Sequence, residues 1–328
     1  MSNQTLNNAE NTNPEQQAPL VQVHSLVKRY GELLALDHFE LNILKGEIFG
    51  LLGPNGSGKT TAINCMLSLL KYSKGEVRLF GQPMKPDNYA VKRRIGIVMQ
   101  NVAVFNELTV AENIDYFCGL YVPEKKKRRT LIDEAISFTG LEDYRKFLPK
   151  KLSGGLLRRL NIACGIAHKP ELIFLDEPTV AVDPQSRNHI LEGIRELNRN
   201  GATIVYTSHY MEEVEQLCTR IMIMDKGKSV AIGTKEELKA MIRTGEKLTV
   251  EVFASAERVL SDILNIDGIY HADITDGLLT ARYPTGSRHL TLILDTLRQN
   301  NIPFGRVTSE PPTLNDVFLE ITGKELKD

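Results

Sequence analysis

A glycine-rich segment carries the clearest chemistry in the sequence. Residues 53–60 read GPNGSGKT and match the phosphate-loop pattern G-x-x-x-x-G-K-[ST]. In such a loop, backbone N–H groups converge on phosphate oxygens, Lys59 reaches the outer phosphates and the Thr60 hydroxyl binds Mg²⁺. The segment predicts a nucleotide site, with a glycine-rich turn carrying an exposed lysine as the alternative. Its candidate nucleotide contacts are Gly53, Pro54, Asn55, Gly56, Ser57, Gly58, Lys59 and Thr60.

Two adjacent carboxylates form the second candidate group. An apolar segment that begins at Leu172 ends in Asp176 and Glu177, and Asp176 follows Lys59 by 117 residues. Folds of the α/β class bind ligands at the carboxyl ends of strands. Because side chains alternate along a strand, two adjacent acids cannot do the same job. Asp176 suits Mg²⁺ binding through water, and Glu177 suits the polarising of an attacking water. Two solvated charges at a strand end are the alternative.

The segments around the phosphate loop predict the elements that position it. Aliphatic and β-branched residues punctuated by glycines favour strands from Leu20 to Leu52, where the loop begins. Apolar residues at helical spacing follow the loop, and this helix is predicted to stop at Gly75. Residues 76–100 are predicted to return to strands.

The next segments complete an alternation of helices and strands. Residues 101–169 favour helices, and Thr109 and Glu112 have the spacing of a capping box. Residues 172–178 and 203–208 are continuous apolar strands, typical of a parallel sheet that is buried on both faces. The fold class is therefore α/β.

The composition excludes several classes of protein. Lys and Arg total 40 against 41 Asp and Glu, which gives a net charge of -1 and a pI of about 6.7. No global basic field exists to hold nucleic acid, so we expect no nucleic-acid partner. No apolar run approaches the roughly 18 residues of a spanning helix. The polar, Asn-rich residues 1–19 lack the apolar region of a signal peptide and predict a disordered lead. We expect the protein to stay in the cytosol.

Two smaller features have simple interpretations. Four cysteines form no CxxC pair and are predicted to be reduced and buried: Cys65, Cys118, Cys164 and Cys218. Residues 125–129 read KKKRR, which predicts a solvated helix face, with a membrane-surface contact as the alternative.

The order of further motifs resembles one family. Between the two nucleotide motifs stands Leu152-Ser153-Gly154-Gly155, followed by a helix-like segment, and this looks like the signature of the ATP-binding cassette (ABC) ATPases. Four more residues stand where that family places functional residues. Gln100 matches its Q-loop glutamine, His209 its switch histidine, Asp183 its D-loop aspartate and Tyr30 its adenine-stacking aromatic. Taken singly, Tyr30 is also compatible with a hairpin aromatic, His209 with a core histidine and Gln100 with a solvated cap.

The resemblance covers about residues 20–235 and extends into the tail. Residues 225–233 and 313–318 look like ATPase subunits of type-2 exporters, including drug and antibiotic efflux systems. Two departures stand out: Leu156 and Leu157 replace the usual polar residues after the signature, and the D-loop reads Val180-Ala181-Val182 before its aspartate. Both leave the phosphate ligands and the candidate base in place.

The resemblance implies a fold and a division into domains. The implied fold is a P-loop NTPase cassette with a RecA-like α/β core, an antiparallel β subdomain and a helical subdomain at about residues 101–165. The cassette is expected to span residues 20–240. After a composition shift near Gly245, residues 247–321 show a strand-helix-strand-strand-helix-strand order followed by a short helix, which predicts a small α+β ferredoxin-like domain at residues 246–328.

The resemblance also implies a mechanism. Two cassettes, expected to form a homodimer, bind head to tail, so that ATP held by residues 53–61 of one, Thr61 included, is covered by Ser153 and Gly155 of the other. Glu177 is then the general base, His209 a γ-phosphate contact and Gln100 a contact to Mg²⁺ and water.

The expected partner is a separate multi-spanning permease, received near residues 101–122, with the chain peripheral on the cytoplasmic face of the inner membrane. A soluble ABC ATPase acting on ribosomes or nucleic acid is the alternative function. A non-hydrolysing subunit and a P-loop kinase are weaker alternatives, because Glu177, His209 and the signature are all present.

Overall fold

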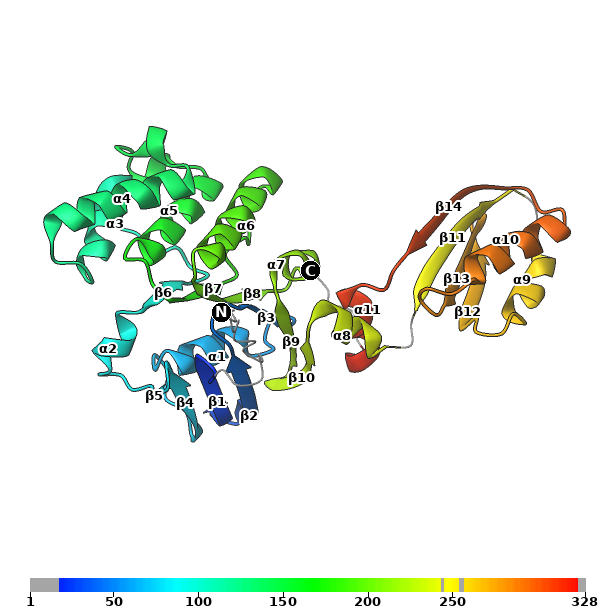
Figure 1. Ribbon diagram of the computed structural model, residues 1–328, viewed down its shortest axis with the longest axis horizontal. Coiled ribbons are helices and arrows are strands. Elements are labelled where there is room, and N and C mark those ends of the chain that lie inside the picture. Colours follow the sequence, from blue (N-terminus) through cyan, green and yellow to red (C-terminus); the bar gives the residue numbers. More distant parts are fainter. Residues whose placement is uncertain (1–17, 243–244, 254–256, 324–328) are drawn as a thin grey trace, which may run out of the picture. The chain divides into compact units, whose positions relative to one another are not determined.

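The computed structural model describes residues 18–242, 245–253 and 257–323 (Figure 1). It forms two compact units. The first contains residues up to 49, 58–207 and 226–228, and the second contains residues 50–57, 208–225 and those from 229 onward. The boundary passes through the phosphate loop. All but the last two residues of the predicted disordered lead lie outside the described residues.

An antiparallel sheet in the first unit has the strand order β2-β1-β4-β5. Its strands are β1 (Val21–Tyr30), β2 (Leu33–Ile43), β4 (Lys74–Leu79) and β5 (Gln82–Pro83). Val21 of the central strand pairs with Ile43 on one side and Leu79 on the other, and all three side chains are fully buried. One face of this sheet is therefore packed in the core, and the predicted antiparallel subdomain is confirmed.

A six-stranded sheet has the order β10-β9-β3-β8-β7-β6. Its strands are β3 (Ile48–Leu52), β6 (Ile95–Val98), β7 (Leu172–Asp176), β8 (Thr203–Ser208), β9 (Arg220–Asp225) and β10 (Lys228–Gly233). β7 runs parallel to both β6 and β8. Every residue of β7 and β8 is buried, as expected for a parallel sheet covered on both faces. The residues that follow β6 and β7 therefore meet at one edge of the sheet.

The helix after the phosphate loop is shorter than the sequence predicts. α1 (Lys59–Met66) ends nine residues before Gly75, and Ser68 has a φ of 55°, a left-handed conformation that stops a helix. Gly75 lies in β4 instead, where a Cβ would be 2.6 Å from the carbonyl oxygens of both His24 and Ser25. Glycine at this position allows β4 to approach β1 and does not end a helix. The prediction of a helix up to Gly75 is wrong.

Three helices that lie between β6 and β7 in the sequence pack against one another (Figure 1). They are α3 (Val110–Gly119), α4 (Lys125–Thr139) and α5 (Gly154–Ile166), and short turns at Glu142–Tyr144 and Pro149–Lys151 join the last two. The predicted capping box is confirmed: Glu112 N donates to Thr109 Oγ1 and Thr109 N donates to the Glu112 carboxylate. Four cations of the basic run at the start of α4 are exposed as predicted, whereas Arg128 is half-buried and donates to Asp115. The remaining helices of the first unit are α2 (Tyr89–Lys92) and α6 (Pro184–Arg199).

The second unit contains a four-stranded antiparallel sheet of order β12-β13-β11-β14. The strands are β11 (Glu246–Val252), β12 (His271–Thr275), β13 (Leu278–Tyr283) and β14 (Phe304–Glu310), with α9 (Glu257–Leu264) after β11 and α10 (His289–Gln299) after β13. Alternate residues of β11 and β13 join the two helices in one apolar core. The predicted ferredoxin-like order is confirmed. The last helix, α11 (Leu314–Thr322), contacts α7 (Met211–Leu217) and α8 (Lys235–Ala240).

Among the described residues, no helix is both long enough and apolar enough to span a membrane. All four cysteines are buried and free, as predicted.

Candidate active site

The phosphate loop joins β3 to α1 and requires glycine at two places. In the second unit, a Cβ on Gly53 would lie 2.4 Å from the Met224 carbonyl oxygen and 2.7 Å from Ser57 Oγ. In the first unit, Gly58 has a φ of 105° and precedes α1, and a Cβ there would lie 2.8 Å from the Ala35 carbonyl oxygen. No larger residue fits at either place. The first N–H groups of α1 have no partner within the helix, and such groups bind phosphate.

Asp176, the buried last residue of β7, is held by two threonines. Thr60 Oγ1 donates to Asp176 Oδ2 at 2.8 Å, and Thr207 Oγ1 donates to Oδ1 at 2.6 Å. Thr60 belongs to α1 and Thr207 to β8, so three elements fix one carboxylate. Mg²⁺ takes one or two protein oxygens together with phosphate oxygens and water. The oxygens of Thr60 and Asp176 therefore fit the ion in number and type.

Glu177 is the centre of a second group of interacting side chains. Its Oε1 lies 3.3 Å from Lys59 Nζ, and its Oε2 accepts a hydrogen bond from Gln100 Nε2 at 3.2 Å. The side chains of Lys59 and Glu177 are only 5% and 6% exposed. Burial lowers the pKa of the Lys59 ammonium below its ordinary value, and the charge of Glu177 opposes that shift. One carboxylate is thus held between a cation and an amide.

A change of backbone conformation, and not strand alternation, gives Asp176 and Glu177 different surroundings. β7 ends at Asp176, and Glu177 has a φ of 47°, in the left-handed region that is strained for a residue with a side chain. The amide N–H of Glu177 donates to both the carbonyl oxygen and Oγ1 of Thr207, at 3.2 and 2.9 Å. A change of backbone conformation between the two residues therefore sends their side chains to different partners.

Two residues of α5 that sequence reasoning missed hold the backbone around Gln100. Arg158 is buried and donates to the carbonyl oxygens of Gln100 and Met99 at 2.7 and 3.3 Å. Asn161 donates to the Met99 carbonyl oxygen at 3.3 Å and accepts from Ala103 N at 3.1 Å. Burial lowers the pKa of Arg158, and the charge of Glu177 opposes the shift. The sequence signals for this link are two polar residues at helical spacing, Arg158 and Asn161, and the place of Arg158 after the signature, where the family pattern has an arginine.

The signature segment forms the exposed start of α5. Ser153 is the N-cap of this helix and accepts from Leu156 N at 3.3 Å, and both Ser153 and Gly154 are exposed. Gly155 is buried against the start of α6, where a Cβ would lie 2.5 Å from Ser186 Oγ and 3.1 Å from Asp183 Oδ2. Asp183 caps α6 by accepting from Ser186 N at 2.9 Å.

The departures from the family pattern have a packing explanation in part. Leu156 is buried in the apolar core that α3, α4 and α5 share. Val182 is buried as well, whereas Ala181 is exposed and has a φ of 58°. An apolar residue at position 156 therefore fills the helical core. Nothing in the structure explains the choice of Ala181.

The two remaining candidate residues have other surroundings. Tyr30 ends β1, is 44% exposed, and has its ring centroid 4.6 Å from Lys28 Nζ. His209 belongs to the second unit and follows β8, where its ring centroid lies 4.2 Å from that of Tyr210. The first unit thus brings Lys59, Thr60, Gln100, Asp176 and Glu177 together, and it places Tyr30 against Lys28.

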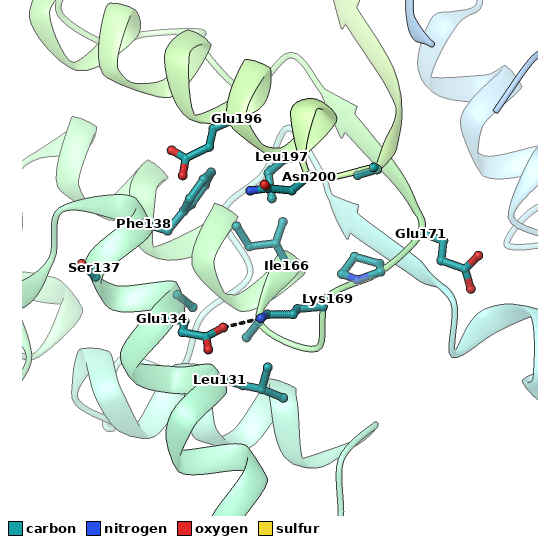
Figure 2. A pocket seen from close by; sticks show the side chains of 15 residues that line it. Leu131, Glu134, Ser137, Phe138, Ile166, Lys169, Glu171, Glu196, Leu197 and Asn200 are labelled. Carbon is teal, nitrogen blue, oxygen red and sulfur yellow. Dashed lines mark ion pairs between the residues drawn. The ribbon is translucent and has the colours of Figure 1, made fainter. Parts of the chain in front are cut away.

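A large cavity of the first unit is lined by other residues (Figure 2). It has a volume of about 840 Å³, and Pro170, Glu171 and Ala202 line it just before β7 and β8 begin. Asp176 and Glu177 lie at the opposite end of β7. Figure 2 shows Lys169 paired with Glu134 across part of the cavity, at 2.5 Å. No residue of the predicted site lines it.

Comparison with known proteins agrees with the motifs. The family described as "ABC transporter" matches residues 36–180, and "ATP-binding protein DrrA1-3-like, C-terminal domain" matches residues 233–322. The chain is 37% identical over 318 residues to the linearmycin resistance ATP-binding protein LnrL of Bacillus subtilis (strain 168), covering 94% of this chain and 100% of LnrL. It is 31% identical over 316 residues to the Nod factor export ATP-binding protein I of Ralstonia nicotianae, covering 94% and 96%.

Solved structures show the same fold. The cassette MJ0796, in a dimeric post-hydrolysis state bound to ADP and Pi, matches with a TM-score of 0.60 and 28% identity, over 65% of this chain and 98% of that one. The likeness to relatives covers nearly the whole chain, from the phosphate loop to the C-terminal domain. The protein therefore belongs to the ATP-binding proteins of ABC exporters, and it is an ATPase that energises export.

Proposed function

We propose that Mg-ATP is bound and hydrolysed where β6, β7 and β8 end. The observation that carries this proposal is the group of Lys59, Thr60, Gln100, Asp176 and Glu177. Three segments of the chain bring it together around the buried side chains of Lys59, Asp176 and Glu177. The group supplies a cation for phosphate, oxygens for a metal ion and a carboxylate for water. A bound Mg²⁺ would neutralise charge on the phosphates, and Thr60 and Asp176 would hold it.

In this proposal, the residues of the site have separate roles in binding and hydrolysis. Phosphate oxygens attract Lys59 away from Glu177, because ATP carries more charge than one carboxylate, and Lys59 stabilises the charge that is transferred. Glu177, freed from the ammonium, accepts a proton from the attacking water. Gln100 Nε2, 3.2 Å from Glu177 Oε2, donates to that water, and the Gln100 side-chain oxygen would contact the metal ion. The remaining proposed contacts are His209 to the γ-phosphate, Tyr30 to adenine, and residues 53–61 to the phosphates.

A second cassette completes the site in this proposal. Ser153 and Gly154 are exposed at the N-terminus of α5, where backbone N–H groups favour the negative γ-phosphate of ATP bound to another subunit. Gly155 and Asp183, packed together within one chain, hold this start of α5 in place. We infer a homodimer whose two sites each use the signature of the other subunit.

The proposed setting is a membrane transporter. A separate multi-spanning permease docks near residues 101–122, where Phe105, Tyr116 and Leu120 are exposed. The chain then lies on the cytoplasmic face of the membrane. In the sequence, a cassette of residues 20–240 is followed by an accessory domain of residues 246–328. Resistance and export in the names of the two relatives support transport over the alternative of a soluble ATPase on ribosomes or nucleic acid.

The oligomeric state of a variant, measured with and without ATP, tests this proposal. Glu177→Gln keeps the size and shape of the side chain and removes the base, so the variant should bind Mg-ATP and elute as a dimer in gel filtration, and return to monomer without nucleotide. The control is Glu171→Gln, which changes an exposed carboxylate at the other end of β7. A Glu177→Gln variant that stays monomeric with saturating Mg-ATP contradicts the proposed dimer.

A second experiment addresses the partner. The tagged full chain is purified from gently solubilised membranes of its own cells, and a multi-spanning protein should accompany it in stoichiometric amount. Recovery with ribosomes in place of a membrane protein contradicts the permease assignment.

A further inference from the structure

Thr207 lies directly opposite Asp176 in the parallel sheet. β7 and β8 pair with Asp176 in register with Thr207, and Thr207 is fully buried near the carboxyl end of β8. Paired residues of neighbouring strands point to the same face of a sheet. The register therefore places a hydroxyl beside the carboxylate that is proposed to serve the metal ion.

The Thr207 hydroxyl joins both acids. It donates to Asp176 Oδ1 at 2.6 Å and accepts from the Glu177 amide N at 2.9 Å. Thr60 holds the other oxygen of Asp176, so the carboxylate cannot rotate without breaking a hydrogen bond in a buried place. One oxygen atom thus fixes the side chain of Asp176 and the backbone of Glu177 together.

The Glu177 backbone needs such support. Its φ of 47° is strained for a residue with a side chain, and strained conformations persist only where surrounding bonds hold them. The amide donates to Thr207 twice, once to the hydroxyl and once to the carbonyl oxygen. The turn that sends the Glu177 carboxylate toward Lys59 and Gln100 therefore depends on Thr207.

We propose that Thr207 is a positioning residue, whose hydroxyl sets the orientation of Asp176 for the metal ion and of Glu177 for water at the same time. This inference rests on the proposed roles of Asp176 and Glu177. It predicts that removal of one buried hydroxyl weakens metal binding and slows hydrolysis together, while nucleotide binding without metal is kept.

The test uses the same substitution at two ends of one strand. Thr207→Val keeps the shape and removes the hydroxyl, and Thr207→Ser keeps the hydroxyl. The matched control is Thr203→Val: Thr203 is also fully buried in β8, and its Oγ1 accepts from Gly46 N at 2.8 Å, far along the strand from the acids. All variants are compared as the full chain.

Three quantities are measured: Mn²⁺ binding to the ATP-loaded protein by electron paramagnetic resonance, kcat, and ATP affinity in EDTA. Outer partners of metal ligands typically contribute 10- to 100-fold to metal affinity or activity. We expect Thr207→Val to weaken Mn²⁺ binding and lower kcat about 10-fold each. ATP affinity in EDTA should be unchanged. Thr207→Ser should restore both losses, and Thr203→Val should cause neither.

The outcomes separate this inference from the proposed function. Unchanged Mn²⁺ affinity and kcat in Thr207→Val overturn the positioning role, and so do equal losses in Thr203→Val, which would indicate a general effect on the strand. If Glu177→Gln abolishes hydrolysis while Thr207→Val is normal, only the role of Thr207 fails. If Glu177→Gln hydrolyses ATP at the full rate, the assignment of the base fails instead.

Discussion

The buried pair of Lys59 and Glu177 gives a prediction whose size follows from the structure. Their charged atoms are 3.3 Å apart, and both side chains are almost completely buried. With an effective dielectric constant of about 20, two unit charges at this distance attract by about 5 kcal/mol. Removing one partner of a buried pair costs about 3–5 kcal/mol, because the other charge stays buried without compensation.

A double-mutant cycle measures this coupling. Lys59→Met, Glu177→Gln and the double variant are unfolded in denaturant without nucleotide and followed by circular dichroism. We expect each single variant to lose more stability than the double variant does, with a coupling free energy of about 3–5 kcal/mol. A coupling below about 1 kcal/mol, the value typical of exposed pairs, would refute the account of a buried pair that ATP must separate.

The same pair predicts a pH dependence. The pKa of Lys59 is lowered in the folded protein, so between that value and its ordinary value of 10.5 the unfolded chain binds more protons. Stability contributed by this group therefore rises with pH through that window. Glu177→Gln removes the charge that opposes the shift, so it should lower the pKa of Lys59 further and extend to lower pH the range below 10.5 in which stability rises with pH. The same range of rising stability in the two proteins contradicts this reasoning.

Two further predictions concern the segments around the site. Arg158→Met should reduce ATP hydrolysis and destabilise the fold by about 1–3 kcal/mol, because the carbonyl oxygen of Gln100 loses its buried donor. Arg159→Met is the control for the denaturation and ATPase assays, because the Arg159 side chain donates to carbonyl oxygens at the end of α4. Gly155→Ala should cost about 1–3 kcal/mol by overlap with Ser186, and Ser186→Gly in the same chain should restore most of that loss in denaturation if the overlap is its cause.

Much of the fold follows from local pattern. Residue types and spacing mark the apolar strand before the phosphate loop, the capping box at Thr109 and the order of elements in the C-terminal domain. The end of α1 is not, because apolar residues continue at helical spacing beyond it. The left-handed Ser68 marks that boundary, and Gly75 serves the long-range contact of β4 with β1.

The candidate site divides in the same way. Lys59, Asp176 and Glu177 are marked by motifs, since their chemistry restricts the residue type at each place. Thr207, Arg158 and Asn161 act through hydrogen bonds whose partners lie far along the chain. Their roles depend on the register of β7 with β8 and on the packing of α5 near Gln100, which composition and spacing do not encode. The positive φ of Glu177 is also a product of this environment.

The rate of ATP hydrolysis by Glu177→Gln tests the central claim most directly. The purified variant and the unmodified chain are compared at saturating Mg-ATP, with nucleotide binding measured on the same samples and Glu171→Gln as the control. The account predicts that Glu177→Gln binds ATP and hydrolyses it at least about 100-fold more slowly, as for loss of a general base. Hydrolysis by Glu177→Gln at the rate of the unmodified chain would contradict it.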